Sequence, residues 1–285
     1  MTLDIDHLRT WIGRTESVTD RIDAGHLAGL MATLDRDELD HQPGDPVPPA
    51  GHWIYFTPCV KSSDIGLDGH AKRGRFLPPV DLPRRMWAGG RIHWQNKLRV
   101  DDSVTRISTI ANVAHKPGRS GDLLFVLVKH QYSSPEGVCI DEEQDIVYRA
   151  APDTMEQQPQ AKLAPRDALW TRTINPDPVM LFRYSALTFN GHRIHYDLPY
   201  VMDMEGYPGL VVHGPLIATL LMDLCRRESP DRILKRFNYR AISPLFHTQP
   251  FTVNGTPKDQ GKNADLWAAN SDGGLAMQAE VEFTD

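Results

Sequence analysis

The chain has 285 residues, of which 24% are charged, and its formal net charge is −6. This composition is ordinary for a globular protein, and the length allows one large domain or two modest domains with separate cores. The negative charge argues against a general nucleic-acid-binding protein, whose surface would carry a basic stripe. We interpret the short basic clusters at 72–75 and 84–85 as solvated faces or as local sites for an anionic ligand.

Neither secretion nor membrane insertion is predicted. The first residues, MTLDIDHLRTW, lack the basic start and apolar run of a signal peptide. No apolar stretch approaches the roughly twenty residues that a membrane span needs. The three cysteines form an odd set, which suggests a reducing compartment, and Cys225 follows the apolar positions of a helix. We therefore expect a cytoplasmic protein with no membrane partner.

Residues 1–150 predict a helix followed by strands. Apolar side chains lie on one side of an amphipathic helix at 18–35, and a loop rich in proline and glycine follows at 42–51. We interpret the short helix-like piece at 83–88 as a central helix that is cut short by Gly89-Gly90. Strands are predicted at 91–100, 105–115, 123–132 and 139–149.

Residues 151–166 are poor in large apolar side chains and rich in proline, so they predict a linker. The following part, 167–285, begins with a helical stretch at 178–188 and a polar loop that holds histidines. A second helix is predicted at 214–227, where Pro215 suits the first turn because its missing N–H is not needed there. Strands are predicted at 232–243, 247–256, 263–272 and 275–283.

A similar order of elements thus occurs twice. The strands are too close together for crossover helices, which favours an α+β fold over a βαβ fold. We interpret the repeat as a duplication, and the alternative is a single α+β domain whose repeats are accidental. Residues 30–35 align with 184–190, but the first half has no counterpart of the histidine loop. We therefore interpret the first half as degenerate, which leaves room for a bulky ligand.

Two neighbouring segments predict the active site. Residues 182–197 read FRYSALTFNGHRIHYD, and residues 212–224 read VHGPLIATLLMDL. The second segment is a helix start that opens with glycine, where free N–H groups can hold an oxygen that is gaining negative charge. A base beside such an oxyanion site is the minimal apparatus for chemistry at a carbonyl or a thioester.

These segments resemble the MaoC-like hydratases and dehydratases, the (R)-specific enoyl-CoA hydratases. That family carries the motif Asp-x-Asn-Pro-(Ile/Leu)-His and, later, a glycine at the start of a central helix. The matching segments here are 190–195 and 213–215. The resemblance implies a double hot-dog fold, in which two antiparallel sheets each wrap around a central helix. It places His195 on the catalytic histidine, Gly214 on the glycine whose N–H holds the thioester oxygen, and Asn190 on the catalytic aspartate.

The variant FNGHRIHYD is similar to one branch of that family, the fungal and mitochondrial 3-hydroxyacyl-thioester dehydratases and the bacterial itaconyl-CoA or mesaconyl-C4-CoA hydratases. Residues 11–35 and 87–94 resemble the bacterial side. The resemblance implies hydration of a short branched or dicarboxylic enoyl-CoA to citramalyl-CoA, a step of itaconate degradation. CoA would be part of the substrate, with no separate cofactor. Alternatives are a (3R)-hydroxyacyl-thioester dehydratase of fatty-acid metabolism, an acyl-CoA thioesterase and a non-catalytic acyl-thioester-binding module. A monomer and a homodimer are both compatible.

We expect His195 to act as the base, because imidazole titrates near working pH. Gly214 suits the oxyanion role because a side chain there would block the ligand. Asn190 is assigned to water positioning, since an amide cannot accept and return a proton. Either His195 handles both proton transfers, or Asp197 or Asp35 contributes. The alternative interpretations are a loop histidine bonded to the backbone, an asparagine that caps a turn, and a glycine that only starts a helix.

Contacts with the substrate are predicted for Arg193, His192, Tyr196 and His213, although His192 also suits a structural role in the loop and Tyr196 suits packing. No metal is expected, because the closely spaced His192, His195 and Asp197 lack the remote fourth ligand of a zinc site. A buried carboxylate on the substrate would need a cation, for which Arg193, Arg84, Arg85 and Arg91 are candidates. Candidates for the CoA phosphates are Arg183, Arg193, Arg226, Arg227, Lys235, Arg236 and Arg240.

Overall fold

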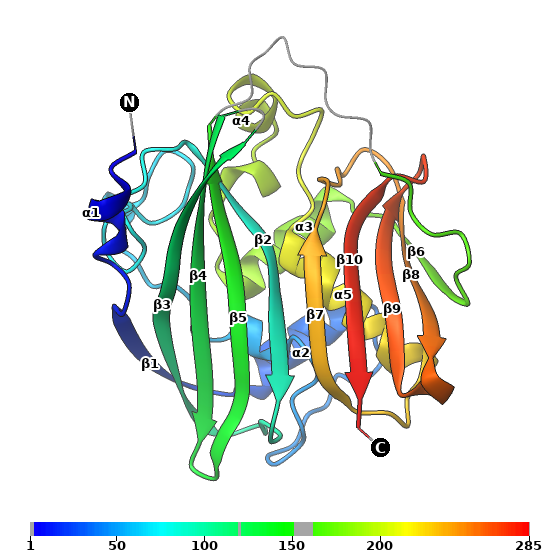
Figure 1. Ribbon diagram of the computed structural model, residues 1–285. Coiled ribbons are helices and arrows are strands. Elements are labelled where there is room, and N and C mark those ends of the chain that lie inside the picture. The colour runs from blue at the N-terminus through cyan, green and yellow to red at the C-terminus, as the bar shows by residue number, and fades with distance from the viewer. Residues whose placement is uncertain (1–2, 119–120, 151–161, 285) are drawn as a thin grey trace.

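The computed structural model describes residues 3–118, 121–150 and 162–284. Ten strands form one antiparallel sheet in the order β1-β3-β4-β5-β2-β7-β10-β9-β8-β6, and the larger helices pack on one face of it (Figure 1). The first five strands are β1 (Thr15–Arg21), β2 (Arg84–Trp94), β3 (Ser103–Gly118), β4 (Gly121–Ser134) and β5 (Gly137–Arg149). The other five are β6 (Trp170–Ile174), β7 (Leu234–Ala241), β8 (Phe251–Lys258), β9 (Asn263–Asn270) and β10 (Leu275–Phe283).

The strand order repeats. Read from one edge inward it is β1-β3-β4-β5-β2, and read from the other edge it is β6-β8-β9-β10-β7, which is the same connectivity. The two series meet where β2 pairs with β7, for example at Gly90 and Tyr239. The predicted α+β double hot-dog fold is confirmed. The division of the chain at 151–166 stays a prediction, because residues 151–161 lie outside the described residues.

The predicted short helix at 83–88 is wrong, because residues 84–88 belong to the start of β2. Gly89 and Gly90 do not end a helix but lie where β2 meets β7. A Cβ atom on Gly89 would be 2.5 Å from the carbonyl oxygen of Tyr239, and one on Gly90 would be 2.3 Å from its hydroxyl oxygen. The glycines therefore let the two halves join. A short apolar run has too few residues for the spacing of its apolar side chains to distinguish a helix from a strand.

Two further elements differ from the prediction. Residues 18–35 are not one helix, because the edge strand β1 ends at Arg21 and helix α2 (Ala24–Thr33) begins after Asp23. The Asp23 carboxylate accepts a hydrogen bond from the His26 N–H at 2.9 Å, which satisfies one of the free donors of the helix start. The edge strand β6 was missed altogether; it pairs only with β8.

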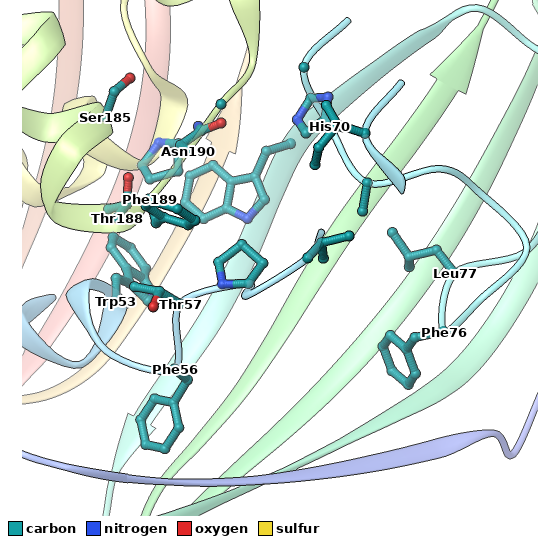
Figure 2. A pocket seen from close by; sticks show the side chains of 18 of the residues that line it. Trp53, Phe56, Thr57, His70, Phe76, Leu77, Ser185, Thr188, Phe189 and Asn190 are labelled. Carbon is teal, nitrogen blue, oxygen red and sulfur yellow. The ribbon is translucent and has the colours of Figure 1, made fainter. Parts of the chain in front are cut away.

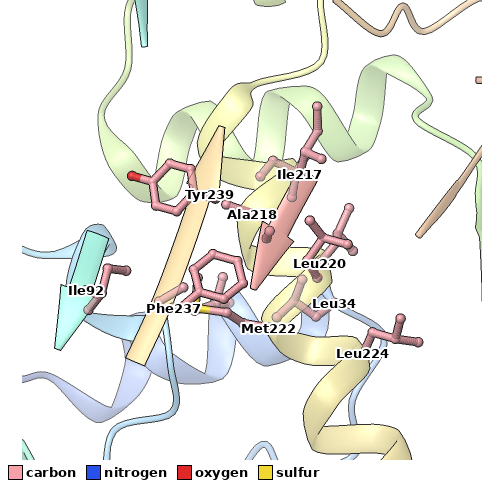
Figure 3. Packing of buried hydrophobic residues seen from close by; sticks show 14 of the residues in the cluster. Leu34, Ile92, Ile217, Ala218, Leu220, Met222, Leu224, Phe237 and Tyr239 are labelled. Atoms are coloured by element: carbon pink, nitrogen blue, oxygen red, sulfur yellow. The ribbon is translucent and has the colours of Figure 1, made fainter. Parts of the chain in front are cut away.

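The predicted helices of the second half are confirmed as α3 (Pro178–Thr188) and α5 (Gly214–Glu228). Every side chain from Leu216 to Cys225 is buried, so α5 is enclosed on all sides. Figure 3 shows Leu220 and Met222 of this helix near Phe237 of β7, with Ile92 of β2 beyond. Helix α5 is therefore the central helix of the second half.

The first half contains no equivalent of α5 among the described residues. Between α2 and β2, residues 34–83 form only the 3-10 turns η1 (Gly51–Ile54) and η2 (Ser62–Asp64). The short helices α1 (Ile5–Arg9) and α4 (Leu198–Asp203) lie elsewhere. None of the described helices is both long and apolar enough to cross a membrane.

Candidate active site

The structure brings His195 and Gly214 together. His195 ends the 3-10 turn η3 (Arg193–His195), and its ring stacks on the ring of His213 with 3.6 Å between centroids. His213 immediately precedes Gly214, the first residue of α5. The Nδ1 atom of His195 lies 2.7 Å from the carbonyl oxygen of Val211, so Nδ1 carries the proton and Nε2 keeps its lone pair. The imidazole is therefore oriented as a base beside the helix start.

Burial keeps the imidazoles of this region neutral. It lowers the pKa of His195 to about 4, against a smaller opposing effect of the Val211 carbonyl. Burial together with the neighbouring histidines lowers the pKa of His192 to about 2 and that of His213 well below its ordinary value. At pH 7 His195 can thus accept a proton without first losing one.

His213 lies behind the base. It is fully buried, and its Nε2 atom is 2.8 Å from the hydroxyl oxygen of Ser185. Its Nδ1 atom is buried without a hydrogen-bond partner. A residue in this position supports the ring of His195, and the predicted contact between His213 and the substrate does not fit its burial.

The start of α5 is free of a side-chain cap. His213 occupies the cap position but makes no capping hydrogen bond, and Pro215 has no N–H to offer. A Cβ atom on Gly214 would lie 3.0 Å from Cε3 of Trp87. The indole ring of Trp87, which comes from β2 in the first half, therefore packs directly against the glycine.

A cavity of about 1000 Å³ adjoins these groups. Trp87 and Pro215, the neighbours of Gly214, line it together with Asn190 and Tyr196. Figure 2 shows Asn190, Ser185 and Phe189 on one side and His70, Phe76 and Leu77, from the loop of the first half, on the other. His195, His192 and Gly214 are not lining residues, but His192 contacts His70 and Asn190 of the wall, and Gly214 contacts Trp87. The two halves therefore enclose one cavity, and its volume is in the upper range for small-molecule sites.

Asn190 holds the catalytic loop. Its Oδ1 atom accepts a hydrogen bond from the His192 N–H at 3.0 Å, which is an Asx turn. The preceding residue, Phe189, closes α3 in the left-handed conformation with φ 49°. The side-chain NH₂ group of Asn190 is not used in this turn, and it belongs to a residue that lines the cavity.

Arg193 and Asp197 are engaged with each other. The Nη2 atom of Arg193 lies 2.7 Å from the Asp197 carboxylate, and its Nη1 atom donates to the Leu67 carbonyl at 3.1 Å. Asp197 also caps α4 through the Tyr200 N–H at 3.1 Å. Both residues thus fix the loop in place. The hydroxyl of Tyr196 donates to the Gly191 carbonyl at 3.0 Å, so Tyr196 combines a loop contact with its position on the cavity wall.

The sequence analysis missed a carboxylate–imidazole pair from the first half. His70 lines the cavity, its Nδ1 atom is 3.2 Å from the Asp68 carboxylate, and its ring lies 4.1 Å from that of His192. Gly69, between the pair, has φ +87°, and a Cβ atom there would be 1.8 Å from the carbonyl oxygen of Gly191. The loop therefore packs directly on the catalytic loop. The sequence signal was an Asp-Gly-His run after a glycine, but no local pattern placed it beside residue 190.

Asp68, His70 and His192 also form the one group of potential metal ligands found among the described residues, with donor atoms within 4.8 Å of one another. Two of these side chains are already hydrogen-bonded to each other. Burial opposes ionisation of Asp68, but the hydrogen bond with His70 prevails and lowers the pKa of the carboxyl group. A hydrogen bond between the Asp68 carboxylate and the neutral His70 ring therefore explains the arrangement. The expected absence of a metal stays a prediction.

The cations of the cavity come from the first half. Lys72, Arg73, Arg75, Arg85 and Arg106 line it, whereas none of the seven candidates proposed from the second half does. Several of those seven are paired elsewhere: Arg226 with Glu38, Arg227 with Asp223, and Lys235 with Glu282. The cluster at 72–75 and Arg85 thus lie on the cavity wall, whereas Arg84 does not.

The comparisons with known proteins agree with this geometry. The family described as hydroxyacyl-thioester dehydratase type 2 matches residues 50–247. The chain is 46% identical over 273 residues to mesaconyl-C(4)-CoA hydratase of Chloroflexus aurantiacus, covering 96% of both proteins. It superposes on a MaoC-like dehydratase from Phytophthora capsici with a TM-score of 0.69 and 14% identity, covering 99% of each chain.

A Mycobacterium tuberculosis protein with a double hotdog fold also matches, with a TM-score of 0.57 and 12% identity over 96% of each chain. These two structures support the fold, and the similarity in sequence supports the reaction class. The chain belongs to the hydroxyacyl-thioester dehydratase type 2 family and is a hydro-lyase.

Proposed function

We propose that the protein hydrates a short dicarboxylic enoyl-CoA of the mesaconyl-C4-CoA or itaconyl-CoA type to citramalyl-CoA, as a step of itaconate degradation. The observation that carries the proposal is the His195 imidazole, with a free Nε2 atom, next to the uncapped start of α5. The 46% identity to a mesaconyl-C(4)-CoA hydratase supports the choice of acyl group.

Each group has a defined task in this reaction. His195 removes a proton from the attacking water, and the Gly214 N–H stabilises the enolate oxygen of the thioester. One such oxyanion donor typically lowers the activation free energy by about 3 kcal/mol. The indole of Trp87 packs against this glycine and leaves no room for a side chain there. Asn190 positions the water through its side-chain amide.

The second proton transfer needs a group that carries a proton when the enolate forms. Asn190 cannot supply a proton in the way a carboxyl group does. Asp197 is committed to Arg193, and Asp35 lies beyond the end of α2, where its carbonyl accepts from Arg227. His70 lines the same cavity as Asn190, but its ring is neutral and its Nδ1 proton is held by Asp68, so its Nε2 atom has a lone pair and no proton to give. We assign the delivery of a proton to Cα to the His195 imidazolium, which forms when His195 takes the proton of the attacking water.

A panel of thioesters tests the proposal. Loss of the enoyl-thioester absorbance band is followed with mesaconyl-C4-CoA, itaconyl-CoA and crotonyl-CoA, and release of free CoA is followed with a thiol reagent. We expect the highest kcat/KM with a dicarboxylic substrate and no thiol release. A preference for crotonyl-CoA would instead support a (3R)-hydroxyacyl-thioester dehydratase, the activity in the family description. Thiol release would support a thioesterase.

The remaining expectations are part of the same proposal. CoA enters as part of the substrate, and no separate cofactor is required. The protein acts in the cytoplasm as a monomer or homodimer, without nucleic-acid or membrane partners. Size-exclusion chromatography with light scattering distinguishes the two oligomeric states.

A further inference from the structure

One cation in the cavity makes neither an ion pair nor a hydrogen bond to a carbonyl within the described chain. Four of the five cations that line the cavity are committed elsewhere. Arg75 pairs with Asp64 at 2.6 Å and Arg106 with Glu16 at 3.7 Å. Lys72 donates to the Ser63 carbonyl, and the Arg73 guanidinium donates to the carbonyls of Val80, Leu82 and Pro83. Arg85 differs from these four, because no described carboxylate lies within ion-pair distance of it and no described carbonyl accepts a hydrogen bond from it.

The place of Arg85 follows from its strand. It stands on β2 two residues before Trp87, so both side chains project from the same face into the cavity. It is half-buried and lies beside Tyr148 of the neighbouring strand. Burial is the largest cause of the lowered pKa of His70 and of His192, and the positive charge of Arg85 lowers both pKa values in addition. The guanidinium is therefore close to the imidazoles that flank His195.

Its strand neighbours make different contacts. Arg84 lies 3.2 Å from Glu205, and its guanidinium stacks over Tyr207. Arg91, further along β2, holds Glu143 at 2.6 Å and Asp145 at 2.9 Å. Of the four arginines that the sequence offered for a substrate carboxylate, Arg84, Arg91 and Arg193 are paired within the protein. Arg85 alone has donors to spare and a place on the cavity wall.

We infer that Arg85 binds the free carboxylate of a dicarboxylic enoyl-CoA. This inference rests on the proposed function and specifies its substrate class. In mesaconyl-C4-CoA the free carboxylate is attached to Cβ, the carbon that receives water. A cation that binds it must therefore lie on the side of the cavity where the imidazole activates the water. Arg85 acts on His192, whose ring lies 5.4 Å from that of His195, between centroids. A guanidinium can hold a carboxylate through two parallel hydrogen bonds, which also fixes the orientation of Cβ.

A change of specificity tests the inference. We compare kcat/KM for mesaconyl-C4-CoA with kcat/KM for 3-methylcrotonyl-CoA, in which a methyl group replaces the carboxylate, and for crotonyl-CoA. In Arg85→Met we expect kcat/KM for mesaconyl-C4-CoA to fall by about 10²-fold, the typical effect of removing a charge-assisted hydrogen bond. The values for the two monocarboxylic substrates should change less than threefold. Arg85→Lys, which keeps the charge but loses the paired geometry, should fall between wild type and Arg85→Met.

Arg91→Met is the matched control. It removes the same charge from the same strand, but Arg91 is paired with Glu143 and Asp145 and does not line the cavity. We expect it to retain the wild-type preference. Equal losses on all three substrates in Arg85→Met, or no loss at all, overturn the inference. Because the result is a ratio within one folded preparation, partial unfolding does not mimic it. A wild-type protein that hydrates none of the thioesters contradicts the proposed function instead.

Discussion

The two halves of the sheet share one strand connectivity, but different structures follow α2 in the first half and α3 in the second half. After α3 the second half has the histidine loop and then α5, whose residues 216–225 are entirely buried. After α2 the first half has the long segment 34–83 without an α-helix. The loss of one central helix opens the cavity that the other half then uses. Divergence of the repeats has thus produced one asymmetric site, with the base and helix start from one half and the cations from the other.

The largest expected effect lies in the second half. His195→Ala removes the base, so kcat should fall by about 10³-fold, within the usual range for a general base. The variant should retain its fold, which circular dichroism checks, because only one side chain of the buried stack is shortened. Retention of turnover would contradict the assignment of His195 as the base.

The contribution of the first half to the catalytic loop is tested at His70. Its ring lies 4.1 Å from that of His192, between centroids. We expect His70→Ala to lower kcat/KM by about tenfold, because loss of this contact misplaces the catalytic loop. An unchanged kcat/KM in His70→Ala would show that the contact does not position the loop.

The contact between the halves is tested with two glycines. Gly69 and Gly13 both have φ +87°, but a Cβ atom on Gly13 would meet nothing within 4 Å. Gly13→Ala should therefore cost only the backbone strain, about 1 kcal/mol of unfolding free energy. Gly69→Ala adds the clash with Gly191 and should also lower kcat/KM by about tenfold, because loop misplacement weakens catalysis. Equal effects in urea unfolding and in activity would show that the loops are not coupled.

The pH dependence probes the buried imidazoles. Since the pKa of His195 is lowered to about 4, kcat/KM should stay high down to pH 5 and be lost as the pH falls through about 4. The unfolded chain binds the proton near pH 6.5, so stability is full above that value and declines as the pH falls from 6.5 toward 4. An acid limb near pH 6.5 would show that the ring is exposed to solvent.

The smallest expected effect is that of a chelator. Because Asp68 and His70 are hydrogen-bonded to each other, we expect dialysis against EDTA to leave kcat unchanged. A loss of activity that Zn²⁺ reverses would assign a metal to Asp68, His70 and His192.

The features that could be predicted from the sequence are those that depend on the local pattern of residues. The buried stripe of α5 and the glycine at its start are readable because helical period and cap chemistry are local properties. The motif at 190–195 predicted the neighbourhood of His195, although which residues would line the cavity could not be read from it. Arg85 was one of four candidate cations that the sequence could not rank, and the Asp68–His70 pair was not identified, because their place depends on how β2 and the loop at 65–71 pack on the other half. The misassigned β2 shows the same limit, since its glycines are explained only by Tyr239 of β7.

The packing of Trp87 against Gly214 gives the protein an optical reporter. Trp87 lines the cavity and packs against Gly214, so an acyl thioester bound at the helix start changes the surroundings of the indole. The emission of this ring should therefore shift on titration with CoA esters, and Trp87→Phe separates its signal from that of the other five tryptophans. Ligand affinity becomes measurable without turnover, even in variants that have lost the base.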